Sequence, residues 1–184
     1  MDNLQTKNKL KILIICGPSG SGKTYLEKNL LIEYPDIYNK LPQVTTRAMR
    51  ENETFGNPYL FLKHHTYDKL KKLLIAKVSN ESKFKQNYGT FPDFDYDKIN
   101  TIIASEEGIL DIIQNKLNIE QEFNVDLKIY ILGLENVYSI DHLNEIMINH
   151  KRNLDIIQKE KEVLKYANQI LKYENNNYPD GLFR

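Results

Sequence analysis

Eight consecutive residues near the N-terminus carry the pattern most directly tied to chemistry. Residues 17–24, with the sequence GPSGSGKT, match the P-loop pattern G-x-x-x-x-G-K-[ST] at every fixed position. In such a loop, backbone N–H groups surround a polyphosphate, the lysine neutralises its outer phosphates, and the last hydroxyl helps to hold Mg²⁺. The residues predicted to bind nucleotide phosphates are therefore Gly17, Ser19, Gly20, Ser21, Gly22, Lys23 and Thr24. Thr24 is also the predicted ligand of Mg²⁺.

The segments on either side of this loop have the character that a phosphate site needs. Residues 11–16 form an apolar run typical of a buried strand, and Leu26, Leu30 and Leu31 share one side of a helical pattern over residues 25–32. A strand, a glycine loop and a helix N-terminus together direct backbone N–H groups at one point. A glycine-rich turn that binds nothing is the alternative, and it leaves the lysine and threonine unexplained.

Arginine is scarce in this chain, and its placement is therefore informative. Of 25 basic residues only four are arginine, and two of these, Arg47 and Arg50, lie three residues apart behind a pair of threonines. The planar guanidinium group binds phosphate through two hydrogen bonds, which lysine cannot copy. The pair predicts a second phosphate site, with a solvated basic loop as the alternative.

The bulk composition excludes several classes of protein. A length of 184 residues suits one domain, and a net charge of zero with a pI near 6.9 gives no reason to expect nucleic acid as a partner. The N-terminal residues are polar and no apolar run approaches a membrane span, so we expect a cytoplasmic protein without membrane contact. Cys16 is the only cysteine, so no internal disulfide is possible, and we expect a buried thiol.

The remaining apolar pattern alternates between strands and helices. Strands are predicted at residues 59–62, within 99–108 and at 126–132, and helices at residues 67–77, 107–117 and 140–173. The residues expected to face inward from the helix at 107–117 are Ile109, Ile112, Ile113 and Leu117. Such alternation favours a parallel sheet covered by helices, with ligands at the carboxyl ends of the strands.

Three motifs, in order, resemble the guanylate kinase family. Residues 45–61 fit T-T-R-x-x-R-x-x-E-x-x-G-x-x-Y-x-F, residues 17–24 resemble that family's P-loop, and residues 87–90 are similar to its tyrosine–glycine–serine/threonine turn. The motifs cover residues 17–90, and a weaker match continues to about residue 170. The resemblance implies an α/β fold: a P-loop NTPase-type parallel sheet flanked by helices, with an inserted mixed α+β segment for the nucleoside monophosphate (NMP) and a short lid.

The resemblance also implies a division of the single domain. The core would comprise residues 10–40 and 97–173, and the NMP-binding segment about 41–92. The lid would lie at about 136–152, and residues 174–184 would form a flexible tail.

Site roles follow from the same resemblance. Arg47, Arg50, Tyr59 and Tyr88 would hold the phosphate of the acceptor monophosphate, and Thr90 would approach the edge of its base. Arg152, in the lid, would join Lys23 and Arg47 in neutralising the transferring phosphate. For the tyrosines the alternative is ordinary packing. For Arg152 it is a solvated helix position.

The chain departs from the family pattern at the positions that would bind the guanine base. The glutamate expected nine residues before Tyr88 is replaced by Ser79, which would bind the substrate beside the base, and two expected aspartates are replaced by Ile103 and Ser105. The nearby carboxylates that could compensate are Glu81, Glu106 and Glu107. Serine cannot offer two acceptors to two N–H donors, so a changed base preference stays open.

The resemblance therefore implies phosphoryl transfer from ATP, with Mg²⁺, to a nucleoside 5′-monophosphate, with GMP or dGMP as the default acceptor. One alternative is a kinase for a different (deoxy)nucleoside monophosphate. A second is a catalytically weak, guanylate-kinase-like binding module, and a third is a P-loop ATPase. For the kinase we expect hinged motion of residues 41–90 and of the region around Arg152.

Overall fold

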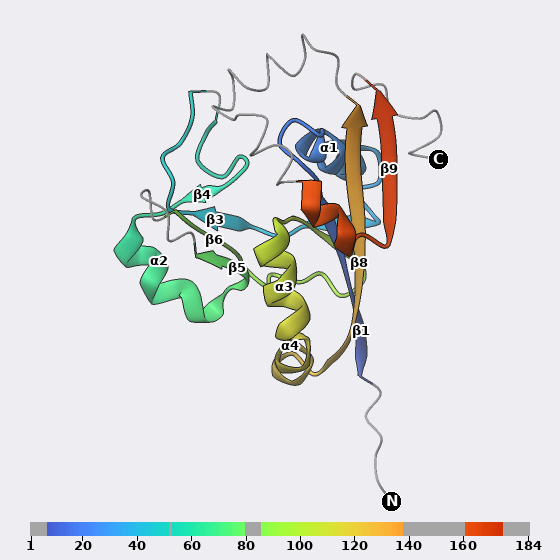
Figure 1. Cartoon of the computed structure of the whole chain (residues 1–184). Helices are drawn as coiled ribbons and strands as arrows, with labels where there is room; N and C mark the ends of the chain where they lie inside the picture. The colour runs from blue at the N-terminus through green and yellow to red at the C-terminus, as the bar shows by residue number, and fades with distance from the viewer. Residues whose placement is uncertain (1–6, 52, 80–85, 138–160, 175–184) are drawn as a thin grey trace, which may run out of the picture.

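The computed structural model describes residues 7–51, 53–79, 86–137 and 161–174, which form two sheets (Figure 1). The larger sheet is entirely parallel and has five strands, in the order β2-β7-β1-β8-β9. Its strands are β1 (Asn8–Cys16), β2 (Tyr38–Lys40), β7 (Ile99–Ile103), β8 (Val125–Val137) and β9 (Gln169–Glu174). The predicted α/β fold with a parallel sheet is confirmed.

The apolar run of β1 occupies the centre of this sheet. Alternate residues of β1 face opposite sides, and Ile14 and Ile15 are both fully buried because helices cover both faces. Ile15 pairs with Ile103 of β7 on one side and with Leu132 of β8 on the other. The carboxyl ends of β1 and β7 therefore meet where the glycine loop begins, and β8 continues beyond them to Val137.

Helices on opposite faces hold the sheet (Figure 1). Helix α1 (Lys23–Glu33) packs Leu26 and Leu30 against Ile15. Helices α3 (Glu106–Gln114) and α4 (Lys116–Glu122) pack on the face that carries Ile14, and their side chains in that core are Ile109, Ile112 and Ile119. Covering both faces in this way is what a parallel sheet requires.

The inward face predicted for residues 107–117 is correct in its first half and wrong in its second. Ile113 is 44% exposed and Leu117 is 70% exposed. The helix is interrupted at Asn115, whose side chain donates a hydrogen bond to the Asp111 carbonyl at 2.8 Å. Because α4 restarts after this interruption, the 3.6-residue period does not continue into Leu117.

The second sheet has four strands in the order β4-β3-β6-β5. They are β3 (Gln43–Thr45), β4 (Leu60–Phe61), β5 (Ile75–Ser79) and β6 (Asn87–Thr90). Helix α2 (His64–Leu70) and the 3₁₀ turn η1 (Lys71–Leu73) cover one face, where Tyr67 and Leu74 pack on Val44. The helix predicted to continue to residue 77 instead ends before β5, and Leu73 is exposed.

The C-terminal part of the chain corrects another prediction. Within the range 140–173, residues 161–166 form the 3₁₀ helix η2 (Lys161–Tyr166), but residues 169–173 belong to strand β9 and not to a helix. Asn168 causes the change, because its backbone N–H donates to the Ile131 carbonyl at 2.8 Å and its side-chain oxygen accepts from the Ile131 N–H at 2.7 Å. These two bonds align the following residues with β8.

The predicted lid and tail lie almost wholly outside the described residues. Residues 136 and 137 end β8 and residue 174 ends β9, while residues 138–152, Arg152 among them, and 175–184 are outside. No helix within the described residues is both long enough and apolar enough to cross a bilayer.

Candidate active site

The glycine loop connects β1 to α1 and depends on glycine at its first position. Gly17 has a φ of +146°, and a Cβ placed there would lie 2.4 Å from the Leu134 carbonyl oxygen of β8. Gly20 and Gly22 also have positive φ, of 76° and 75°. The loop is thus tightly pressed against the sheet and leads directly into the N-terminus of α1, which favours an anion.

Lys23 lies over this loop. Its Nζ donates hydrogen bonds to the carbonyls of Gly17 at 2.9 Å and Pro18 at 2.8 Å. Thr24 is exposed in the first turn of α1, a turn that contains no acidic residue. A positive helix end, an ammonium group and a hydroxyl therefore lie together at the start of α1, where a polyphosphate is expected.

A magnesium ion fits this corner only in company with a nucleotide. The described residues contain no cluster of three or more His, Cys, Asp or Glu side chains. Mg²⁺ is commonly held by substrate phosphates, waters and one or two protein oxygens, which the Thr24 hydroxyl can supply. Ile103 ends β7 without a carboxylate, and Ser105 directly precedes α3.

Cys16 precedes the loop and is fully buried. Burial raises the pKa of its thiol to about 11, which outweighs the opposite influence of the Lys23 ammonium. The thiol therefore stays protonated at neutral pH and is not a nucleophile.

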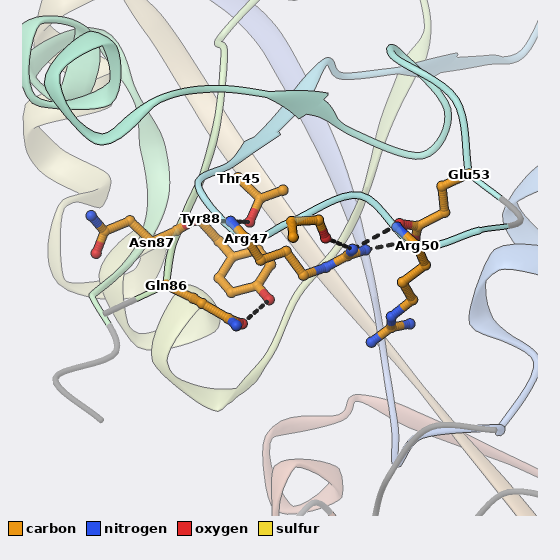
Figure 2. Close-up of polar contacts among 8 residues, drawn as sticks. Thr45, Arg47, Arg50, Glu53, Gln86, Asn87 and Tyr88 are labelled. Carbon is orange, nitrogen blue, oxygen red and sulfur yellow. Dashed lines mark hydrogen bonds and ion pairs between the residues drawn. The ribbon is translucent and has the colours of Figure 1, made fainter. Parts of the chain in front are cut away.

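Arg47 is the most firmly held side chain of the second site (Figure 2). Its Nη1 and Nη2 donate to the two carboxylate oxygens of Glu53 at 2.7 and 2.6 Å, and Nη1 also donates to the Ala48 carbonyl at 2.8 Å. The guanidinium carbon lies 5.3 and 5.4 Å from the ring centres of Tyr59 and Phe61. The arginine side chain is only 8% exposed.

These contacts orient Arg47 without exhausting its donors. A guanidinium group has five N–H donors, and the three bonds to Glu53 and Ala48 use three of them. The Nε–H and the second Nη2–H lie along one edge of the plane, outside these bonds. That edge is a two-pronged donor of the kind that binds phosphate.

Glu53 holds Arg47 in place, whereas the sequence predicted it only as a member of the motif, without a role of its own. Its carboxylate also accepts the Arg50 N–H at 2.9 Å, so it fixes both the loop and the arginine. The hydrogen bond from Arg47 lowers the pKa of Glu53 and raises the pKa of Arg47. Its position three residues after Arg50 was the available signal.

The other predicted phosphate ligands lie around Arg47. The Tyr59 and Tyr88 rings meet edge to face at 5.9 Å, and burial raises the pKa of Tyr59 to about 12. Its phenol is therefore a neutral hydrogen-bond donor over the physiological range. The exposed Arg50 directs its guanidinium away from the Arg47–Glu53 pair (Figure 2).

The structure does not bring Ser79 together with the other predicted site residues. In the antiparallel register Ser79 is opposite Asn87, whereas Val78 is opposite Tyr88. Ser79 therefore faces the other side of the sheet, donates to Asn87 Oδ1 at 3.4 Å, and lines a surface pocket with Tyr67. The predicted place of Ser79 beside the base came from its spacing to Tyr88, whereas the face on which a strand residue lies is set by register.

Thr90 lies on the same face as Tyr88, two residues along β6. Its side chain is fully buried, and its hydroxyl has no hydrogen-bond partner within the described part of the chain. Of the carboxylates proposed to compensate, Glu106 accepts from Tyr166 and Lys165 at 3.0 and 2.8 Å. Glu107 is exposed and Glu81 lies outside the described residues.

Comparison with known proteins gives a consistent result. The family model described as guanylate kinase matches residues 9–166. The guanylate kinase of Thermotoga maritima is 28% identical over 125 residues, which are 67% of this chain and 58% of that protein. That of Trichormus variabilis is 33% identical over 78 residues, 42% of this chain and 38% of that protein.

The matched segments thus span less than two thirds of these relatives' own lengths. Among solved structures, the guanylate kinase of Anaplasma phagocytophilum superimposes with a TM-score of 0.60 at 17% identity, covering 94% of this chain and 79% of that one. This likeness concerns the fold, and the family model covers most of the sequence. The chain belongs to the guanylate kinase family.

Proposed function

We propose that this protein transfers the terminal phosphoryl group of ATP, with Mg²⁺, to a nucleoside 5′-monophosphate, giving ADP and a nucleoside diphosphate. The observation that supports this most is the preset Arg47 guanidinium, held by Glu53 and by two aromatic rings with one donor edge left over. A P-loop ATPase has no need of such a second phosphate site.

Catalysis of this kind consists of positioning and charge neutralisation. Lys23, the loop N–H groups and the α1 N-terminus would hold the ATP phosphates, and Thr24 would contribute to holding Mg²⁺. Mg²⁺, when bound, supplies further neutralisation of the transferring phosphate. Arg47 and the Tyr59 phenol would hold the acceptor phosphate so that its oxygen is in line with the ATP γ-phosphate.

GMP or dGMP is the default acceptor, because the relatives that match the chain are named guanylate kinases. The absence of carboxylates at Ile103 and Ser105 favours testing other bases with equal care. It is also the observation that favours a second candidate function, a guanylate-kinase-like module that binds a protein partner and has little catalytic activity.

The test is ADP production from ATP and Mg²⁺ against GMP, dGMP, AMP, CMP, UMP, dUMP, dCMP and dTMP. We expect acceptor-dependent ADP formation, which the variant Lys23→Met should abolish. Lys28→Met is the matched control, because Lys28 is an exposed lysine on the same helix. ATP binding without turnover of any acceptor would favour the binding module, and turnover that ignores the acceptor would favour an ATPase.

A further inference from the structure

We propose that Gln43 determines base specificity, because its amide hydrogen-bonds one acceptor and one neighbouring donor on the edge of the base. In this proposal the site does not bind a purine 2-amino group. This inference rests on the proposed kinase function and concerns the same site. The first step is the register of the second sheet: Gln43 is opposite Thr90, and Thr45 is opposite Tyr88. Opposite and alternate residues share a face, so Gln43 and Thr90 lie on the Tyr88 face.

The Gln43 amide is held in a fixed orientation. Its Nε2 donates a hydrogen bond to the Ile103 carbonyl at 2.8 Å. Ile103 ends β7 and pairs with Ile15 of β1, two residues before the glycine loop. Gln43 thus stands between the acceptor-binding sheet and the edge of the main sheet where ATP would lie. Its Oε1 and its second Nε2–H remain as one acceptor and one donor.

Thr90 provides the second observation. Its hydroxyl is buried and has no partner among the described residues, which is uncommon for a polar group in a folded protein. Cross-strand neighbours have Cβ atoms about 5 Å apart, so Gln43 and Thr90 form one neutral polar pair. A ligand edge placed beside this pair would satisfy the hydroxyl.

The neighbouring strand contributes no carboxylate to this face. Ile75 is opposite Thr90 and Val78 is opposite Tyr88, whereas Ser79 lies on the other side. Guanine presents two adjacent donors, N1–H and the 2-amino group, next to its O6 acceptor. An amide supplies one acceptor and one donor, so it matches O6 and N1–H and leaves the 2-amino group without a partner among the described residues of this face. Hypoxanthine has the same edge without that group.

The experiment compares IMP with GMP, which differ only in the 2-amino group, as acceptors for the 184-residue chain. We expect kcat/KM for IMP to equal or exceed that for GMP. Gln43→Leu should lower kcat/KM about ten-fold or more for whichever monophosphate is accepted best, mainly through KM. Gln43→Glu adds a second acceptor, so it should raise the ratio of kcat/KM for GMP to kcat/KM for IMP by about ten-fold. Gln121→Leu, at an exposed glutamine of α4, is the matched control.

A wild-type preference for GMP over IMP above ten-fold, or a Gln43→Leu variant with unchanged kcat/KM, would overturn the inference. If no acceptor is phosphorylated, the kinase proposal fails, and the inference is then decided by calorimetric titration of IMP and GMP. The inference is supported if the wild type binds IMP and GMP equally and Gln43→Leu has lost this affinity. It is rejected if the wild type binds neither monophosphate, or if Gln43→Leu binds them as the wild type does. Circular dichroism of each variant excludes misfolding as the cause of a loss, and Gln43→Glu provides an independent reading if Gln43→Leu does not fold.

Discussion

At the scale of single residues, the Arg47–Glu53 pair explains why arginine and not lysine stands at this position. One edge of the guanidinium is bound by the carboxylate and its faces lie near Tyr59 and Phe61, while the other edge keeps two donors. An ammonium group cannot divide its donors between two planar edges in this way. The pair therefore presets the arginine before any ligand arrives.

Replacing Arg47 tests whether this edge binds the acceptor phosphate. We expect Arg47→Ala to raise the acceptor KM and lower kcat, with a combined cost on the order of 2–4 kcal/mol. Arg47→Lys should recover little, because it keeps the charge but not the planar donors. Steady-state kinetics with the best acceptor measure both effects. An unchanged kcat/KM would remove Arg47 from the site.

Glu53 gives a pH-dependent prediction for stability. The hydrogen bond from Arg47 lowers the folded-state pKa of Glu53, so the unfolded chain binds the proton more readily and stability rises with pH. The contribution is complete above about pH 4.3, the ordinary glutamate value, and is lost as pH falls through the lowered folded value. Glu53→Gln should cost about 1–3 kcal/mol of unfolding free energy at pH 7.

Urea unfolding at pH 7, 5, 4 and 3 measures this difference, which should shrink toward the acid end. Glu51→Gln is the control, because Glu51 is exposed in the same loop. A difference between wild type and Glu53→Gln that stays constant down to pH 3 would contradict the assigned ion pair.

At the scale of elements, the sequence correctly predicted those features that are determined by the local pattern of residues. The strand, glycine loop and helix around residues 17–24 follow from an apolar run, a fixed motif and a helical period, and all three are present. Long-range register decided the rest. Ser79 was placed by counting along the chain, but the pairing of β5 with β6 puts it on the other face. Leu117 and the residues of β9 followed a helical period that Asn115 and Asn168 interrupt.

Gly17, in the turn between β1 and α1, and Gly56, in the loop before β4, make a matched pair of glycine variants. Gly17→Ala would combine a positive φ with a Cβ 2.4 Å from the Leu134 carbonyl, whereas Gly56 has a φ of +87° and open space around its Cβ position. Gly56→Ala should therefore cost only the left-handed strain, about 1 kcal/mol, and Gly17→Ala clearly more. Urea unfolding of both variants checks this order. Equal losses would mean that the loop is not pressed against β8.

At the scale of the whole molecule, the only cysteine reports on the opening of the core. Cys16 is fully buried in the central strand, and its thiol pKa is raised to about 11 by that burial. We expect a thiol reagent such as dithionitrobenzoate to react slowly with the native protein at pH 8 and quickly in urea. Reaction at the rate of a free thiol without denaturant would show that β1 opens locally.

Two segments of the chain join the main sheet to the second sheet, and the predicted closure over the substrates would occur about them. The chain passes from the main sheet to the second at residues 41–43, where the Leu41 N–H donates to the Thr101 carbonyl at 3.1 Å and Gln43 contacts Ile103. It returns through residues 91–98. The second sheet is also held by β5, because Ile75 and Ala76 pack in the main core with Ile109. The proposed kinase function predicts movement about the two crossings, which would exclude water from the transferring phosphate.

Solution scattering with a bisubstrate analogue tests this motion. A compact chain of this length has a radius of gyration of roughly 16 Å, and we expect a measurable decrease when the analogue links the two sites. Arg47→Ala should still bind the ATP half through the P-loop but fail to compact, because the second sheet has lost its hold on the phosphate. Compaction in that variant would assign closure to the P-loop alone, and no compaction of the wild type would argue against a hinged kinase.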